Sequence, residues 1–293
     1  MFYKKSKGEL IFDICNHILM ILLVVITLYP CYYVLVASVS DPVKAFSSNG
    51  LLLYPKGFSL SSYLEVIKSE QIWLGYRNTL LYVVCGGFLS VFLTVTAAFA
   101  LTRKGLPGKN LLTFLILFTM YFHGGMIPTY LVVKSVGLLN SPLVMILINA
   151  VATYNLIITI SYFRGLPESL EEAAKIDGAG DYTILFKIMI PLAKPIIAVI
   201  TLYYAVAIWN DFMTSLIYLN DRKLLPLQMV LREILIQNNT NSVAATGTAE
   251  DAQAYAENLK YAIIVVSTVP ILCVYPFIQK YFVKGVMIGA VKG

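Results

Sequence analysis

The feature that most constrains this chain is a series of long apolar runs separated by polar segments. A bilayer core about 30 Å thick needs about 20 apolar residues per spanning helix, and the runs meet that need. They predict six spans, at residues 11–38, 78–101, 111–133, 142–163, 195–219 and 261–282. The expected fold class is therefore all-α, a polytopic membrane protein with six transmembrane helices.

Composition also favours a membrane protein over a water-soluble one. Of the 293 residues, 58% are hydrophobic and only 13% are charged, whereas a soluble domain is about half apolar and about a quarter charged. Neither an internal repeat nor a low-complexity linker divides the sequence, so we expect one transmembrane domain over residues 1–293. The four cysteines lie in apolar runs without CxxC or disulfide-like spacing, which is typical of small apolar side chains in a membrane.

The placement of lysine and arginine predicts the orientation. Arg103, Lys104 and Lys109 crowd one short loop, whereas the short loop on the other side carries only Lys134. Because positive residues are retained in the cytoplasm, we expect the N-terminus and residues 164–194 inside. Residues 220–260 then form an extracytoplasmic loop. The net charge of +6 is a signal of topology and does not indicate nucleic-acid binding.

A charged segment at residues 164–194 interrupts the apolar pattern. Pro167 suits the first turn of a helix, and Gly178 can provide a left-handed helix end. Asp181 can cap a second short helix, which Pro191 ends or kinks. Negative charge is favoured near the start of the first helix, where three acidic residues lie: Glu168, Glu171 and Glu172. The residues thus predict two short helices joined by a bend, either gripped by a partner or forming an ordinary solvated loop.

The spacing within this segment resembles the EAA loop of permease subunits of ATP-binding cassette (ABC) importers. Three elements carry the resemblance: Glu172-Ala173-Ala174, Gly178 and Ile188-x-x-Pro191. Leucine is more usual where Ile190 stands. Two further stretches are similar to the carbohydrate-uptake branch of the family, which includes the maltose permease: Trp209-Asn210-Asp211-Phe212 and the tail that ends in Lys292-Gly293. Almost the whole chain is covered.

The resemblance implies a type I ABC importer permease fold and a division of labour among subunits. Such a permease forms half of a translocation pore, here with a second permease subunit as a heterodimer. A separate dimer of ATPase subunits hydrolyses ATP, so the chain itself would be no enzyme and would need no cofactor. An extracytoplasmic sugar-binding protein delivers the carbohydrate, for which we expect an oligosaccharide. The location implied is the bacterial cytoplasmic membrane, with lipid around a multi-pass chain.

In this family the EAA loop is the coupling helix, which docks into a cleft of the ATPase. The resemblance implies that the motif glutamate pairs with a basic residue there, that the alanines allow close packing and that the glycine makes the bend. The tail lysine is a candidate ATPase contact, with a solvated charge as the alternative. The expected ATPase-coupling set is Glu172, Ala173, Ala174, Asp177, Gly178, Pro191 and Lys292.

Polar residues inside the fourth and fifth predicted spans indicate a transport path, because polar groups are costly in lipid and usually face a bundle interior or a cavity. The candidates are Asn149, Tyr154, Asn155, Trp209, Asn210 and Asp211. Aromatic faces with amide and carboxylate groups suit sugar recognition. The same side chains could instead hold helices together, and both interpretations remain open.

The outer loop occupies the position from which the maltose permease contacts its binding protein. The resemblance therefore implies contacts with the binding protein at Asn238, Asn239 and Asn241.

Other function classes have less support in the residues. A secondary transporter predicts repeats and several intramembrane charges, whereas Asp211 is nearly alone in the spans. A membrane enzyme needs a catalytic or metal-binding group, but GxSxG and HExxH are absent. Gly108-Lys109 is followed by asparagine and lacks the upstream glycine of a Walker A motif, so ATP must be bound by another chain.

Overall fold

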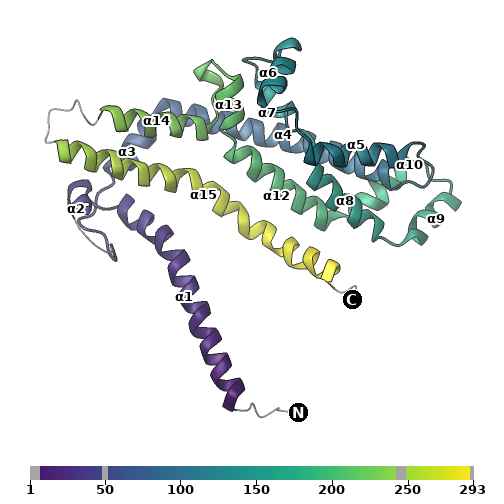
Figure 1. The fold of residues 1–293 in the computed structure, drawn as a ribbon, viewed down its shortest axis with the longest axis horizontal. Helices are drawn as coiled ribbons and strands as arrows, with labels where there is room; N and C mark the ends of the chain where they lie inside the picture. The colour runs from purple at the N-terminus through teal and green to yellow at the C-terminus, as the bar shows by residue number, and fades with distance from the viewer. Residues whose placement is uncertain (1–6, 48–51, 242–248, 291–293) are drawn as a thin grey trace. The chain divides into compact units, whose positions relative to one another are not determined.

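The computed structural model describes residues 7–47, 52–241 and 249–290 (Figure 1). Within these ranges every regular element is a helix, and an isolated bridge pairs Ser40 with Phe58. The expected all-α class is confirmed. The chain divides into two compact units, of which unit 1 comprises residues 1–69 and 233–269, and unit 2 comprises residues 70–232 and 270–293.

Unit 1 contains α1 (Lys7–Ser38), α2 (Pro42–Phe46), α3 (Ser61–Lys68) and parts of α14 (Leu227–Asn241) and α15 (Ala249–Ala290). Its centre is a polar junction at Asn258, which is 4% exposed. The Asn258 amide accepts a hydrogen bond from the Ser62 hydroxyl and donates to the carbonyls of Ala37 and Ser40. These bonds join α3 and α15 to the end of α1. Most apolar side chains of α1 are exposed, which suits a helix surrounded by lipid.

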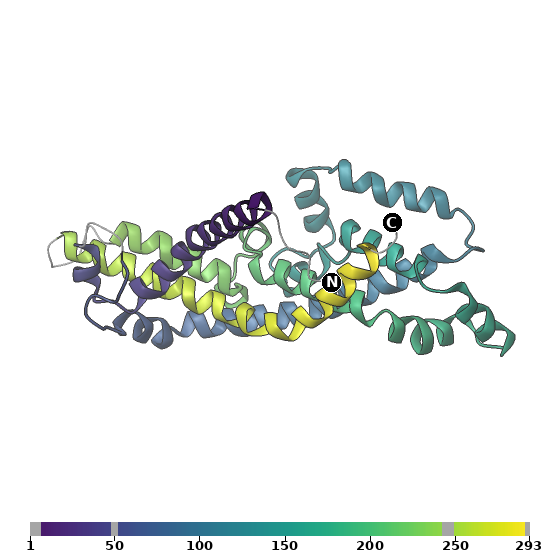
Figure 2. The same cartoon turned by 90° about the horizontal axis from the view of Figure 1, so that it is seen from below.

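Unit 2 contains the remaining helices, whose bounds are α4 (Glu70–Thr102), α5 (Lys109–Tyr121), α6 (Met126–Ser135), α7 (Pro142–Leu147), α8 (Thr153–Arg164), α9 (Glu168–Ile176), α10 (Asp181–Thr183), the π-helix η1 (Ile184–Met189), α11 (Ile190–Leu192), α12 (Lys194–Asn210), α13 (Met213–Tyr218) and the 3-10 helix η2 (Arg222–Leu224). The longest of them, α4, packs along α8 and α12 (Figures 1 and 2). Unit 2 is thus built around one rod of about 50 Å, at about 1.5 Å per residue.

Small residues on one side of α4 let its neighbours approach. Gly86, Ser90, Thr94 and Ala98 recur every fourth residue and are all buried, as expected where helices pack closely in a membrane. The Thr94 hydroxyl makes a hydrogen bond of 2.7 Å with the Tyr204 hydroxyl of α12. This stripe is why α4 lies at the centre of unit 2.

A second polar contact joins the N-terminal half of α4 to the segment after α13. The Asn78 amide donates to the carbonyls of Lys223 and Leu225, at 2.8 and 3.0 Å. The Tyr82 hydroxyl donates to the Leu224 carbonyl at 2.8 Å, and the Thr79 hydroxyl accepts from the Leu227 backbone N–H at 2.8 Å. We call these three side chains, with residues 223–227, the polar clamp.

The predicted spans are only partly continuous. Three described helices are long and apolar enough to cross a membrane, namely α1, α4 and a stretch of α15 at Gln253–Cys273. The number rises to as many as five if each of two bent pairs counts as one span: Lys109–Tyr121 with Met126–Ser135, at 118°, and Asp181–Leu192 with Lys194–Asn210, at 82°. The predicted spans at 111–133 and 142–163 are therefore not straight helices, and the count of six stays a prediction.

The break in the fourth predicted span has a local explanation. Residues 148–152 separate α7 from α8, which leaves backbone groups without helical partners. The Tyr204 hydroxyl accepts the freed Ala152 N–H at 3.0 Å while it also bonds Thr94. A side chain from α12 therefore compensates the interruption.

Candidate functional site

The candidate site is built on α9, which lies beyond the C-terminal end of α4 (Figure 1). Pro167 takes the N-cap position, one residue before the first turn in which it was expected. The helix ends at Asp177, and Gly178 has the left-handed φ of +79°. The Ala179 N–H reaches back to the Ala174 carbonyl at 2.9 Å. The left-handed helix end predicted at Gly178 is thus present, and glycine adopts it without a steric penalty.

The second short helix differs from the prediction at its start. Gly180, not Asp181, is the N-cap, and Asp181 is the first helical residue without a side-chain capping bond. The prediction of an Asp181 cap is wrong because the Gly180 carbonyl already accepts the first helical bond, from the Ile184 N–H at 3.0 Å.

Pro191 lies where the second helix changes character. The backbone is a π-helix at residues 184–189, α11 follows, and the chain then bends by 82° into α12. Proline lacks the N–H that an α-helix directs to residue i−4, and its ring clashes with that carbonyl. This explains a wide turn before Pro191 and the kink after it, as the sequence predicts.

The two sides of α9 have different surroundings. Ala174 is 8% exposed and belongs to the cluster that contains Ile184 and Leu185. Its small side chain therefore packs within this chain. Glu172 and Ala173 are exposed, and Ile176, one turn after Glu172, is 86% exposed. Because residues three and four apart share a helix face, these residues form one outward face.

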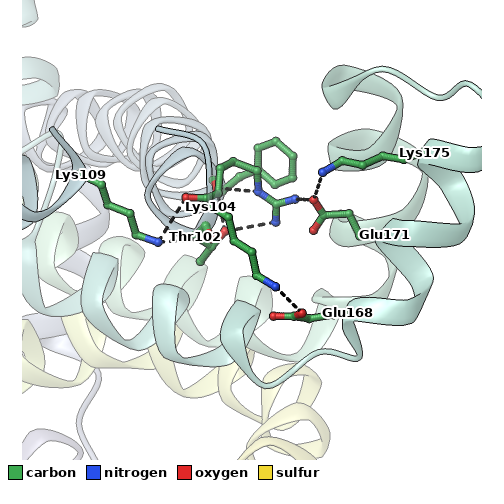
Figure 3. Close-up of polar contacts among 8 residues, drawn as sticks. Thr102, Lys104, Lys109, Glu168, Glu171 and Lys175 are labelled. Carbon is green, nitrogen blue, oxygen red and sulfur yellow. Dashed lines mark hydrogen bonds and ion pairs between the residues drawn. The ribbon is translucent and has the colours of Figure 1, made fainter. Parts of the chain in front are cut away.

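Ion pairs tie α9 to the segment after α4. The Glu171 carboxylate pairs with the Arg103 guanidinium and, at 2.8 Å, with the Lys175 ammonium group. The Lys104 ammonium group lies 2.7 Å from the Glu168 carboxylate. Figure 3 shows Lys175 and Lys104 directed at these two acidic residues. We call these five side chains the charged brace.

Arg103 also binds the end of α4. Its Nε donates to the Phe99 carbonyl at 3.3 Å, its Nη2 donates to the Thr102 hydroxyl at 3.3 Å, and the guanidinium lies 4.1 Å from the centre of the Phe99 ring. Arginine and lysine near a helix C-terminus donate hydrogen bonds to the last carbonyls and interact favourably with the helix dipole. Lys109 adds a bond to the Arg103 carbonyl at 3.3 Å, so the chain is fixed where it leaves α4.

The protonation equilibria of the brace reflect this pairing. Partial burial alone would raise the pKa of the Glu171 carboxyl, but hydrogen bonds and charge attraction from Lys175 and Arg103 outweigh burial, so its pKa lies below the ordinary value. The hydrogen bond to Glu168 and its charge raise the pKa of the Lys104 amine, although this side chain is solvent-exposed. Both groups are therefore held in their charged forms.

A cleft of about 710 Å³ opens beside the brace. Both α9 and the 102–107 segment line it, and Glu172, Arg164 and Lys175 are among the lining residues. Within the described part of the chain, Glu172 makes no ion pair or hydrogen bond through its side chain. Of the three glutamates on α9, Glu168 and Glu171 pair with cations of this chain, and Glu172 is exposed without such a pair.

Two exposed apolar residues of this segment were not among the predicted coupling residues. Ile176 is 86% exposed and Tyr182 is 84% exposed, and they flank the Gly178 bend. In the sequence, both stand out only as large apolar side chains within a polar segment. Ile176 also lies one helical turn after Glu172. The same pattern also occurs on buried helix faces. Only their exposure in the structure therefore identifies these two residues as candidates for contact with a partner.

The predicted transport-path residues are spread over different environments. Asn149 lies exposed in the break between α7 and α8. Tyr154 is 55% exposed beside the Tyr203 ring, at 6.4 Å, whereas Asn155 is buried. The structure brings Tyr154 to an open face of the bundle and places its neighbour inside the bundle.

The three candidates in the fifth predicted span make contacts within the chain. Trp209 is buried with its ring 6.2 Å from the Tyr76 ring. The Asn210 amide donates to the Val206 carbonyl at 2.9 Å, and the Asp211 carboxylate accepts the Thr214 N–H at 3.0 Å. Asp211 is the C-cap of α12, and its carboxylate thus bonds the first turn of α13 across the break between the two helices.

The predicted binding-protein contacts Asn238, Asn239 and Asn241 fall at the end of α14, so their backbone is helical. Lys292 lies outside the described residues.

Comparisons with known proteins agree with this architecture. The family described as "Binding-protein-dependent transport system inner membrane component" matches residues 72–288. Protein LplC of Bacillus subtilis is 40% identical over 98% of this chain and 97% of that protein. The polygalacturonan/rhamnogalacturonan transport system permease protein YtcP of the same organism is 41% identical, over 97% of this chain and 99% of its own length.

A solved structure provides an independent comparison. The chain is similar to one chain of a bacterial ABC transporter involved in the import of the acidic polysaccharide alginate, with a TM-score of 0.86 and 32% identity. The match covers 96% of this chain and 99% of that one. Together with the apolar helices, these likenesses show that the protein belongs to the binding-protein-dependent transport system inner membrane components and is an integral membrane permease of the ABC importer class.

Proposed function

We propose that this chain is one of two permease subunits in an ATP-driven oligosaccharide importer, and that it forms half of the translocation pore. A separate ATPase dimer hydrolyses ATP, and a sugar-binding protein outside the membrane delivers the cargo. The N-terminus and residues 164–194 face the cytoplasm, as the lysine and arginine distribution supports. The observation that carries the proposal is the outward face of α9, on which the unpaired Glu172 carboxylate stands beside exposed Ile176.

The outward face has the chemistry of a docking surface. Glu172 supplies a charge for a basic residue of the ATPase, and Ala173 allows close approach. Ile176 and Tyr182 supply the apolar anchors that interfaces bury at their centres. Asp177, Gly178 and Pro191 shape the segment that presents them, and Lys292 extends the contact from the tail.

The proposed cargo is an oligosaccharide derived from an acidic polysaccharide. Support comes from the 41% identity with a polygalacturonan/rhamnogalacturonan permease and from the likeness to an alginate importer. Within this chain, Tyr154 and Asn149 are the path residues exposed to a passing sugar. Asn210 and Asp211 shape the path by bonding the backbone beside it, and Asn155 and Trp209 do so by packing inside the bundle. The binding protein contacts the end of α14 at Asn238, Asn239 and Asn241.

Co-purification of the ATPase with Glu172→Lys tests the docking proposal. Glu168→Lys is the matched control, because it makes the same charge change on the same helix. We expect the ATPase to be lost from the Glu172→Lys complex and retained in the control, since Glu168 faces Lys104 of this chain. Retention of the ATPase by Glu172→Lys, with ATP hydrolysis unchanged, would contradict the assignment.

A further inference from the structure

The charged brace contains two ion pairs that join the same two segments but differ in burial. The side chains of Arg103 and Glu171 are 16% and 22% exposed, whereas those of Lys104 and Glu168 are 81% and 68% exposed. An exposed pair is hydrated and screened and contributes little. A partly buried arginine that also bonds two groups of the preceding helix, as Arg103 does with α4, is held in one geometry. The Arg103 pair is therefore the contact that fixes α9.

Arg103 is bonded on both of its sides. Toward α4 it holds the Phe99 carbonyl, the Thr102 hydroxyl and the Phe99 ring, and toward α9 it holds Glu171. A displacement of α9 thus acts on the last turn of α4 through one rigid guanidinium group. Lys175 holds the same Glu171 carboxylate from within α9, one turn later, so the carboxylate has little freedom to rotate away.

The other part of α4 is fixed as well. Asn78, Thr79 and Tyr82 hold residues 223–227 through four bonds of 2.8 to 3.0 Å. Tyr82 and Thr79 are 2% and 1% exposed. Since α4 is continuous from Glu70 to Thr102 without an internal proline, a rod fixed in both halves connects α9 to the segment that leads into α14.

We propose that Arg103 is a positioning residue for energy coupling: it locks α9 to α4, so that a push by the ATPase on α9 moves residues 223–227 in the same step. The inference rests on the proposed docking of the ATPase on α9. Energetic coupling between two sites can be carried by such a chain of packed and bonded groups that has discrete arrangements. Without Arg103, α9 moves while α4 stays.

Spin-label distances in the complete importer, purified in nanodiscs, test this role. Labels are placed on cysteines introduced at the exposed positions Ser169 and Arg222, after Cys15, Cys31, Cys85 and Cys273 are changed to serine. The distance distribution is recorded without nucleotide and with ATP and vanadate. In the otherwise unchanged chain we expect one narrow distribution whose width is the same in both states.

Arg103→Glu should broaden the distribution while the ATPase stays in the complex. Glu171→Gln, which keeps the side-chain shape, should broaden it too, and this second variant covers the case in which Arg103→Glu does not assemble. Lys104→Glu, at the exposed pair, should leave the distance distribution narrow.

The inference is overturned if Glu171→Gln gives the same distribution as the unchanged chain, if the distribution of the unchanged chain is itself broad, or if Lys104→Glu broadens the distribution as much as Arg103→Glu. Loss of the ATPase would be seen separately by co-purification and would count against the docking proposal instead.

Discussion

Helix α4 is held in its two halves by different chemistry. In its N-terminal half, the polar clamp consists of neutral side chains bonded to backbone groups, with two of the four hydrogen bonds buried and two partly buried. At its C-terminal end, the charged brace consists of ion pairs, one of which is largely exposed. Buried neutral bonds are costly to leave unmade, whereas ion pairs near water are weak and can exchange partners. The comparison indicates that the clamp is the more costly attachment to break, and that within the brace the partly buried Arg103–Glu171 pair holds more firmly than the exposed Lys104–Glu168 pair.

The largest effect on stability is expected at the polar clamp. Tyr82→Ala removes a ring that is 2% exposed and leaves a cavity, which should lower the free energy of unfolding by roughly 3 kcal/mol. Thermal unfolding of the purified permease measures it. Tyr82→Phe keeps the ring and loses only the bond to the Leu224 carbonyl, so about 1 kcal/mol is expected. Equal losses in the two variants would show that the hydroxyl, and not packing, dominates the clamp.

Close backbone approach near the clamp gives the next prediction. A Cβ atom at Gly75 would lie 3.0 Å from the Leu227 Cα, whereas one at Gly87 of the same helix would meet no atom within 4 Å. Gly75→Ala should therefore cost about 1 to 3 kcal/mol through overpacking. Gly87→Ala is the matched control and should be neutral or slightly stabilising, because alanine favours helix. The same unfolding assay measures both variants. An unchanged free energy of unfolding in Gly75→Ala would contradict the close contact of α4 with α14.

At the charged brace a smaller loss is expected. Arg103→Ala should lower the free energy of unfolding by about 1 kcal/mol, since Glu171 keeps Lys175 as a partner. Lys104→Ala should leave the unfolding midpoint unchanged, because its pair with Glu168 is exposed. Raising the salt concentration should reduce the loss of stability caused by Arg103→Ala, because salt screens an ion pair. The loss caused by Tyr82→Phe should not change with salt. Equal salt dependence at the clamp and the brace would remove the distinction between them.

The smallest effect is a dependence on pH. The pKa of Glu171 is lowered in the folded chain, so its contribution to stability is present above the ordinary glutamate pKa and is lost as the pH falls through the lowered value. The difference in unfolding midpoint between the unchanged chain and Glu171→Gln should therefore shrink as the pH falls from about 6 to about 3. A difference that stays constant over this range would show that the carboxylate charge contributes nothing.

The local signals in the sequence predicted the ends of α9 well. The Gly178 bend and the kink at Pro191 follow from residues that restrict their own backbone, so neighbouring positions suffice to predict them. The breaks in the spans at 111–133 and 142–163 could not be predicted in this way. The interruption before α8 is compensated by Tyr204 from α12, and a compensation of this kind depends on tertiary packing.

The brace shows the same limit for the site. The acidic residues of α9 were visible in the sequence as a group favoured by the helix dipole. Which of these acidic residues forms an ion pair within the chain depends on where the fold places Arg103 and Lys104. Likewise, the sequence offers Asp211 as a candidate for sugar contact, and only the structure shows that its carboxylate accepts the Thr214 N–H, because α13 begins there with N–H groups to be satisfied.

The most direct test of the account is ATP-driven uptake into proteoliposomes that contain the complete importer and its binding protein, with oligogalacturonides as cargo. The account predicts that Glu172→Lys abolishes this uptake, while Glu168→Lys retains it, because the Glu172 carboxylate is exposed without an ion pair in this chain, whereas that of Glu168 pairs with Lys104. Uptake by Glu172→Lys at the unchanged rate, with the ATPase still bound, would contradict the claim that energy enters the permease through this face.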